Sequence, residues 1–332
     1  MNLKNILLPL LISLLSIASS DANTPARSIY NIVRSGNMDA VKIFLKQHND
    51  QAVLNNGLGA AIIGRQYAIL DYLVEQGADV NYLNNNTPIL IQAIMSNRIE
   101  SAKKLIAYGA DVTARGYTRQ EQGMNIRWDW SVLMCATRNG DLTLIKEVLK
   151  NGANITDTGW SLNDKEIENS ADIAAYSGHL HVLKFLLKTK ALTLNNNTIF
   201  KTVRGGHIET VKYLLKDLKD INRQGPFRGR SLLIEAAWWG YPKMVQLLID
   251  EGADVNAMDA YGYTAVSEAT DKDFSNQDTQ YQVVQTLIDN GADLNIKSHT
   301  GIYPLDRALK YGNENITMLL IENSAERTLF DN

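Results

Sequence analysis

The sequence has little of what several classes of protein depend on. Its 332 residues contain a single cysteine, Cys135, which excludes an intramolecular disulfide framework and a zinc site built from several thiolates. Six prolines and 22 glycines exclude collagen-like and proline-rich chains. Neither sign of charge dominates, because 33 Lys and Arg residues face 36 Asp and Glu residues, for a formal net charge of −3. This balance gives no indication of nucleic-acid binding, while a 45% hydrophobic content is typical of a chain that buries a core.

Long apolar runs are also scarce after the start of the chain. A short segment with one lysine precedes an uncharged apolar stretch from Ile6 to Ile17, and small residues follow up to Ala22. This pattern predicts a secretory signal peptide over residues 1–22, cleaved after Ser20 or, by preference, after Ala22. The stretch of about 12 residues is too short to cross a hydrocarbon core as a helix, and an uncleaved anchor is the alternative. We therefore expect residues 23–332 to be exported and to have no stable membrane span.

The rest of the chain repeats itself. The pentad Gly-Ala-Asp-Val-Asn at residues 77–81 recurs at 252–256, and altered copies start at Gly109, Gly152 and Gly291. Before each copy lies a segment such as AILDYLVEQ, whose apolar residues recur at three- and four-residue spacing and predict an amphipathic helix. A shorter segment with small residues in its middle, such as SLLIEAAWWG, precedes that helix. The unit is therefore helix, tight turn, helix and extended loop, with a period of about 33 residues.

On these residues the chain resembles the ankyrin-repeat family. Beside the pentads, the motifs that carry the resemblance are Thr87-Pro88, Gly178-His179, Gly206-His207, Gly262-Tyr263-Thr264-Ala265 and Tyr303-Pro304-Leu305. The resemblance implies an all-α solenoid of about nine helix-turn-helix units, in one ankyrin-repeat domain at residues 23–332. Three insertions depart from the family pattern and are expected to form surface loops: Ala114–Asp129, Asp157–Glu168 and Asp271–Thr279.

Residues suited to catalysis or metal binding are few. Cys135 lies in an apolar helix with no base near it in sequence, so we expect a buried and unreactive thiol. His179 and His207 follow glycines that end first helices, where the resemblance implies structural histidines bonded to a neighbouring turn. His179 and His181 have no third ligand at metal-binding spacing. We predict that the protein is not an enzyme and has no catalytic residue, metal or cofactor.

The resemblance also implies where a partner binds. In this family the loop tips and the ends of the first helices line a concave face, and Trp, Tyr and Arg are the residues that dominate interface hot spots. The alternative is that these aromatic side chains stack on neighbouring repeats and serve stability. The predicted protein-binding residues are Tyr117, Arg127, Trp128, Arg138, Trp160, Tyr176, Arg204, Phe227, Arg228, Trp238, Trp239, Tyr261, Tyr263 and Tyr311.

Together these features predict an exported module that binds one protein partner, and no nucleic acid, through its concave face. Similarity to exported bacterial ankyrin proteins implies a periplasmic location, with secretion as the alternative. The leading hypothesis is an immunity protein that neutralises a toxic effector, such as a phospholipase of a type VI secretion system. The alternatives are a periplasmic scaffold that supports stress-protective enzymes and a secreted effector that binds host proteins.

Overall fold

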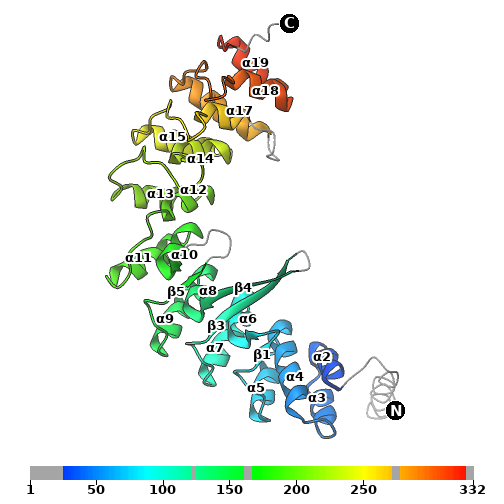
Figure 1. Ribbon diagram of the computed structural model, residues 1–332. Coiled ribbons are helices and arrows are strands. Elements are labelled where there is room, and N and C mark those ends of the chain that lie inside the picture. Colours follow the sequence, from blue (N-terminus) through cyan, green and yellow to red (C-terminus); the bar gives the residue numbers. More distant parts are fainter. Residues whose placement is uncertain (1–24, 122–123, 161–166, 271–276, 327–332) are drawn as a thin grey trace, which may run out of the picture. The chain divides into compact units, whose positions relative to one another are not determined.

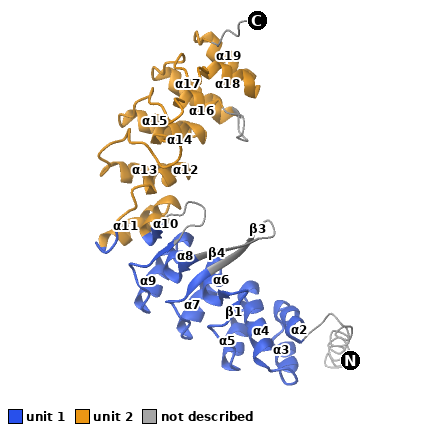
Figure 2. Ribbon diagram, viewed as in Figure 1, with its two compact units in different colours: residues 1–170, 189–192 blue, residues 171–188, 193–332 orange. Residues whose placement is uncertain are grey.

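The structure is a computed structural model that describes residues 25–121, 124–160, 167–270 and 277–326, without the side chains of residues 117–128, 160 and 277. The chain divides into two compact units (Figure 2). Unit 1 comprises residues 1–170 and 189–192, and unit 2 comprises residues 171–188 and 193–332. No helix among the described residues is long and apolar enough to cross a membrane, and the predicted signal peptide lies outside them.

The helices of unit 1 follow one another as pairs joined by tight turns (Figure 1). Within a pair, the second helix carries one buried stripe, as the three- and four-residue spacing predicted; in α5 the stripe is Ile69, Leu70 and Leu73. The pairs are α2 (Pro25–Arg34) with α3 (Met38–Leu45), α4 (Gln51–Gly64) with α5 (Tyr67–Glu75), α6 (Ile89–Met95) with α7 (Ile99–Ala107), and α8 (Val132–Asn139) with α9 (Leu142–Lys150).

Within the described residues of unit 1, three short antiparallel hairpins lie between the helices. They pair β1 (Leu83–Asn84) with β2 (Thr87–Pro88), β3 (Arg115–Glu121) with β4 (Met124–Ser131), and β5 (Thr158–Trp160) with β6 (Ile167–Asn169). The last two occupy insertions for which the sequence predicted surface loops, and that prediction is wrong in this respect. Backbone N–H and C=O groups need partners, and pairing the two arms of each insertion supplies them.

The two longer hairpins pack against each other within unit 1. A Cβ on Gly159 would lie 2.5 Å from the carbonyl oxygen of Asp129, so only glycine permits this approach of β5 to β4. Arg115 links the same strands, because its Nη2 donates to the carbonyl of Asp129 at 2.9 Å and to that of Thr158. The hairpins are therefore integral parts of the repeat stack. Of the third predicted insertion, Asp271–Thr279, residues 271–276 lie outside the described part, and residues 277–279 are the first turn of α17 and not a loop.

Unit 2 continues the pattern of helix pairs. Its first helices stack in order, α12 on α14, α14 on α16 and α16 on α18, and α15, α17 and α19 stack in the same way. Buried alanines such as Ala236, Ala237 and Ala308 allow the close approach of the first helices. The pairs are α10 (Ser170–Tyr176) with α11 (Leu180–Lys188), α12 (Thr198–Arg204) with α13 (Ile208–Leu215), α14 (Leu232–Trp238) with α15 (Pro242–Asp250), α16 (Ala265–Ala269) with α17 (Gln277–Asp289), and α18 (Pro304–Tyr311) with α19 (Glu314–Glu322).

The pentads form turns that connect successive repeats. Gly252 has a φ of 93°, a left-handed conformation in which glycine avoids the strain of a side chain. The Asp254 carboxylate then accepts the N–H of Asn256 at 2.9 Å, and the Asn256 side chain accepts the N–H of Asp293 in the next repeat at 2.8 Å. Asn222 makes the equivalent bond to the N–H of Asp254, at 2.7 Å. The pentad therefore sets the turn within one repeat and the register of the repeat that follows.

Candidate functional site

Three successive first helices of unit 2 carry a buried charge at the same position of the repeat. Glu235, Glu268 and Arg307 are each the fourth residue of their helix, and the two glutamates are 2% and 0% exposed. Burying a charge without a partner is costly, so the surrounding residues have to compensate for it. The equivalent residues of the preceding repeats are uncharged: Ile91, Cys135, Ala174 and Thr202.

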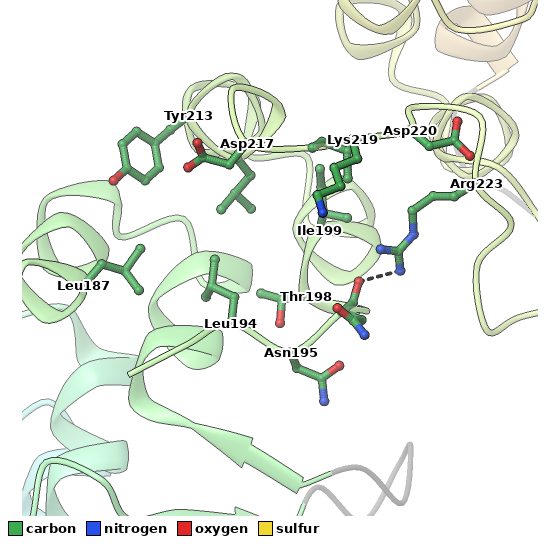
Figure 3. A pocket seen from close by; sticks show the side chains of 13 residues that line it. Leu187, Leu194, Asn195, Thr198, Ile199, Tyr213, Asp217, Lys219, Asp220 and Arg223 are labelled. Carbon is green, nitrogen blue, oxygen red and sulfur yellow. Dashed lines mark hydrogen bonds between the residues drawn. The ribbon is translucent and has the colours of Figure 1, made fainter. Parts of the chain in front are cut away.

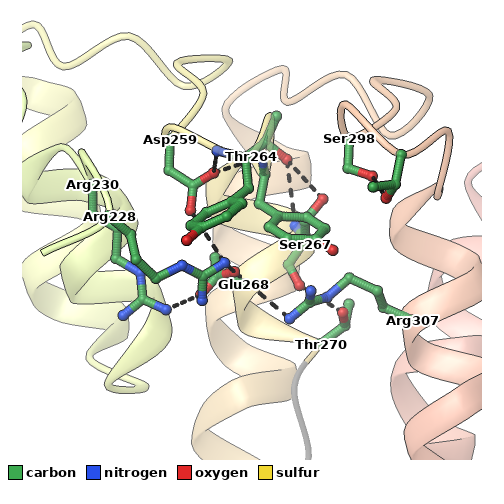
Figure 4. A network of polar contacts seen from close by, with 12 residues as sticks. Arg228, Arg230, Asp259, Thr264, Ser267, Glu268, Thr270, Ser298 and Arg307 are labelled. Carbon is green, nitrogen blue, oxygen red and sulfur yellow. Dashed lines mark hydrogen bonds and ion pairs between the residues drawn. The ribbon is translucent and has the colours of Figure 1, made fainter.

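Two arginines from the loop that precedes α14 supply the compensation. Arg230, which is 1% exposed, forms an ion pair with Oε2 of Glu268 and lies 3.7 Å from Oε2 of Glu235. The other oxygen of Glu268 lies 3.6 Å from both Arg228 and Arg307 (Figure 4). Burial raises the pKa of Glu268, and the three arginines oppose this shift. Burial also lowers the pKa of Arg230, against the attraction of Glu268 and Glu235.

Asp259 connects this ion network to two tyrosines. Its Oδ1 accepts the backbone N–H groups of Tyr261 at 2.8 Å and Tyr263 at 2.9 Å, and its Oδ2 lies 3.5 Å from Arg228. The loop is thereby held so that both rings lie against the Arg228 guanidinium, with Cζ-to-centroid distances of 4.6 and 5.6 Å. Tyr263 also lies 4.2 Å from Cζ of Arg307. The buried carboxylate thus fixes a stack of cationic and aromatic groups.

The two adjacent tryptophans join the network from α14. Both are half-buried, and their rings meet edge to face at a centroid distance of 4.9 Å. The Trp238 ring lies 4.4 Å from Cζ of Arg230. Nε1 of Trp239 donates to Oε1 of Glu235 at 3.1 Å, and the same oxygen accepts Nε of Arg204 at 3.0 Å. Each tryptophan therefore contacts the buried charges and also keeps part of its surface open.

The structure brings many of the predicted binding residues together in unit 2. We call the assembly the arginine–aromatic cluster and define it by thirteen side chains. Those that the sequence predicted are Arg204, Phe227, Arg228, Trp238, Trp239, Tyr261, Tyr263 and Tyr311. Those that sequence reasoning missed are Arg230, Glu235, Asp259, Glu268 and Arg307. The signal for Glu235, Glu268 and Arg307 is a charged residue inside an apolar first helix, as in SLLIEAAW, repeated in register along the chain; Arg230 and Asp259 lie in loops and have no such signal.

The other predicted binding residues lie apart from these contacts. Tyr176 ends α10 in unit 2, where its ring is 5.9 Å from Nζ of Lys201. Arg138 is exposed at the end of α8 in unit 1, with its guanidinium 5.5 Å from the buried Trp130 ring. The remaining four belong to the hairpins of unit 1, and their side chains lie outside what the structure describes: Tyr117, Arg127, Trp128 and Trp160.

The surroundings of Cys135 and His207 indicate structural roles for both side chains. Cys135 is fully buried, and burial raises the pKa of its thiol to about 12, so the reactive thiolate is suppressed. The His207 ring hydrogen-bonds to the backbone of Tyr176, and a Cβ on Gly178 would lie 2.4 Å from Nδ1 of that ring. This contact agrees with the structural role that the resemblance implied for His207. Within the described residues, no group of three or more His, Cys, Asp and Glu side chains could hold a metal ion.

Unit 2 also contains a hollow of about 430 Å³ beside α11, α12 and α13 (Figure 3). Its wall includes Leu187, Leu194 and Tyr213, and Arg223 closes part of the rim by donating to the carbonyl of Asn196 at 2.6 Å. Apolar side chains alternate there with both signs of charge, so the lining favours no single ligand chemistry. None of the predicted binding residues lines it.

Comparison with known proteins agrees with the repeat architecture. A family model described as "Ankyrin repeats (3 copies)" matches residues 29–116 and 171–259, which together make up more than half of the chain. The "Ankyrin repeat and KH domain-containing protein mask-1" of Caenorhabditis elegans is 23% identical over 301 residues. That alignment covers 86% of this chain but 10% of the relative, so the chain spans about a tenth of that protein's length. Ankyrin repeats are in general non-enzymatic modules that bind other proteins. From the helix pairs, the pentad turns and the matched family model, we conclude that this chain belongs to the ankyrin-repeat family.

Proposed function

We propose that the chain binds one protein partner through the arginine–aromatic cluster of unit 2. The observation that carries the proposal is that exposed aromatic rings lie on arginine side chains, which buried carboxylates hold in place. Tyr261 and Phe227 remain 54% and 49% exposed, while the arginines beneath them, Arg228 and Arg230, are held by buried carboxylates. Aromatic and arginine side chains dominate interface energetics, and groups already held in place lose less entropy on binding.

The buried charges support this proposal because they are a poor means of stabilisation. An apolar group of similar volume commonly stabilises a core as well as, or better than, a buried ion network. The preceding repeats satisfy the same position with uncharged residues such as Ile91. The charged residues in unit 2 therefore serve to hold Arg228, Trp239 and Tyr261 in a fixed arrangement at the surface.

Capture of the partner and measurement of its affinity test this function. With the captured protein purified, Tyr261→Ala should raise the dissociation constant of the complex roughly tenfold or more, as expected for an interface hot spot. Tyr281→Ala is the matched control, because Tyr281 is a partly exposed tyrosine on α17 of the same unit. Equal affinities for Tyr261→Ala and the unsubstituted chain, or an equal loss with Tyr281→Ala, would contradict the proposal.

We further propose that the protein is exported to the periplasm and acts there as an immunity protein. Support for export is the sequence pattern of residues 1–22, and support for immunity is a binding face on a protein without catalytic motifs. A toxin gene beside this one should kill cells when its product is directed to the periplasm. Co-expression of the full chain, which includes residues 1–22, should rescue the cells. Co-expression of a form that lacks residues 1–22 should not. A lack of rescue would contradict the immunity role and leave the scaffold and the host-directed effector as alternatives.

A further inference from the structure

The distribution of charge around the arginine–aromatic cluster is one-sided. We define the first-helix face as the helices α10, α12, α14, α16 and α18 with the loop residues 193–197, 223–230, 257–263 and 296–303. Within this described face, the carboxylates other than the half-buried Asp306 are all buried: Asp172, Glu235, Asp259 and Glu268. The cations that are partly or fully exposed there are Lys201, Arg204, Arg223, Arg228, Lys297 and Lys310. The face thus presents positive charge to solvent on a chain whose net charge is −3.

The buried carboxylates leave part of the hydrogen-bonding capacity of the surrounding arginines unused. Arg228 retains 30% of its side-chain exposure, and its two ionic contacts, at 3.5 and 3.6 Å, are too long to be hydrogen bonds. Its Nε has no hydrogen-bond partner among the described residues. Arg204 donates through Nε to Glu235 and is 35% exposed. A guanidinium has five N–H donors, so both arginines can donate to a further carboxylate at modest cost.

The aromatic neighbours prepare these arginines for carboxylate binding. Tyr261 and Tyr263 lie against Arg228 with their ring centroids 4.6 and 5.6 Å from Cζ. A stacked guanidinium is restrained, while its N–H groups point outward in its own plane, where a carboxylate binds with two parallel hydrogen bonds. The exposed parts of Phe227 and Tyr261 offer apolar area beside that position.

We infer that the face binds an acidic segment of a partner protein, whose carboxylates contact Arg204 and Arg228 and whose apolar side chains lie on Phe227 and Tyr261. This rests on the proposed function, since it assigns the chemistry of the partner that the same face binds. Nucleic acid also carries negative charge, but nucleic-acid-binding domains have a marked excess of basic residues, which this chain lacks. The exposed carboxylates Asp250, Asp289 and Glu322 lie on second helices, away from the first-helix face, and do not compete there.

The test uses a random-sequence peptide library displayed on phage, selected in parallel against the full chain and against the Arg204→Gln/Arg228→Gln double variant. Peptides recovered on the unsubstituted chain should be enriched in Asp and Glu next to apolar residues, and the double variant should not retain them. Synthetic copies in which Asn and Gln replace Asp and Glu should bind about tenfold more weakly or worse, since charge-assisted hydrogen bonds are lost. This second comparison leaves the protein unchanged and is therefore independent of its folding. Binding should also weaken as salt is added.

The matched control is the Lys212→Gln/Lys243→Gln double variant, which removes two exposed cations from the second helices α13 and α15 and should bind as the unsubstituted chain does. Recovered peptides without acidic enrichment, or acidic peptides that the arginine double variant still binds, would overturn the inference. So would a single-stranded DNA oligonucleotide that binds more tightly than the peptides. If non-acidic peptides are recovered and Tyr261→Ala abolishes their binding, the acidic chemistry is wrong and the proposed binding face stands. If binding survives both Tyr261→Ala and the arginine double variant, the proposed function fails as well.

Discussion

Arg230 and Glu268 form an ion pair between the loop that precedes α14 and the helix α16, and both side chains are almost entirely removed from solvent. The pair joins two successive repeats of unit 2, and the helix position of Glu268 is uncharged in the earlier repeats, from Ile91 to Thr202. Because Arg228 and Arg307 contact the same carboxylate, Glu268 is the centre of the buried network. Loss of its charge would remove the ion pair of the buried Arg230 and one charged contact each from Arg228 and Arg307.

The Glu268→Gln variant should therefore be strongly destabilised. We expect the free energy of unfolding to fall by about 3 kcal/mol or more, as is typical when one partner of a buried ion pair is removed. Urea denaturation followed by circular dichroism measures this change. Removing both partners, as Arg230→Met with Glu268→Leu, should recover part of the loss. If Glu268→Gln alone were as stable as the unsubstituted chain, Glu268 would not be the residue that balances the charge of the surrounding arginines.

Asp141, the N-cap of α9, should make stability depend on acidic pH. Partial burial raises the pKa of Asp141, but hydrogen bonds from Thr143 and Leu144 and the charge of Lys103 outweigh it and leave the pKa below its ordinary value. Its contribution is thus present above about pH 4 and is lost as the pH falls through the lowered value of the folded state. Asp141→Ala should cost about 1 kcal/mol at neutral pH, and the difference should shrink in acid. Asp141→Asn keeps an accepting oxygen without titrating, so a pH dependence identical to that of the unsubstituted chain would contradict this account.

His207 should also destabilise the fold in acid, at a higher pH than Asp141 does. Burial lowers the pKa of His207, with a smaller opposing effect from its bond to Tyr176 and a further lowering by His179. Since the unfolded chain takes up the proton more readily, stability should fall as the pH drops from about 6.5 through the lowered value. His207→Gln should remove this part of the pH dependence of the thermal midpoint. A profile between pH 5 and 7 that is unchanged by the substitution would be inconsistent with a half-buried imidazole whose pKa is lowered.

Asn256 should hold two repeats in register. Its side chain accepts the backbone N–H of Asp293 at 2.8 Å, while its own N–H donates to Asp254. Asn256→Ala should cost about 1 kcal/mol, the usual value of one intramolecular hydrogen bond. Hydrogen exchange at the Asp293 amide should accelerate, whereas exchange at the amide of Asp111, which is bonded to Asn81 in unit 1, should not change. Acceleration at both amides, or at neither, would argue against a local bridge between neighbouring repeats.

Local signals in the sequence predicted most of the helical framework. Helix pairs and turns follow from periodicity, because each repeat meets the same neighbours and places the same residue types on the same faces. The hairpins at β3–β4 and β5–β6 were missed because an insertion has no counterpart in other repeats, and strand pairing depends on contacts between separate segments. Part of the site was predicted for a related reason. The repeat register places Arg204 and Trp238 at equivalent helix ends, so stacking brings them near each other.

The buried half of the cluster was not predicted. A charged residue in a short helical segment is usually exposed, so the sequence analysis did not single out Glu235 or Glu268. Only the stacking of α14 on α16 shows that both face the interior, and only the path of the loop at residues 223–230 brings Arg230 to them. Recognition of such a site from sequence requires a comparison of the same repeat position across units.

Hydrogen exchange of the full chain with and without its purified partner tests the central claim most directly, because it maps the contact surface without any substitution. If the arginine–aromatic cluster is the binding face, protection on binding should be strongest in the loops at residues 223–230 and 257–263 and at the ends of α12 and α14. The second helices α13, α15 and α17 should exchange at the same rate in both states. Protection confined to those second helices or to unit 1, with the two loops unchanged, would contradict the account.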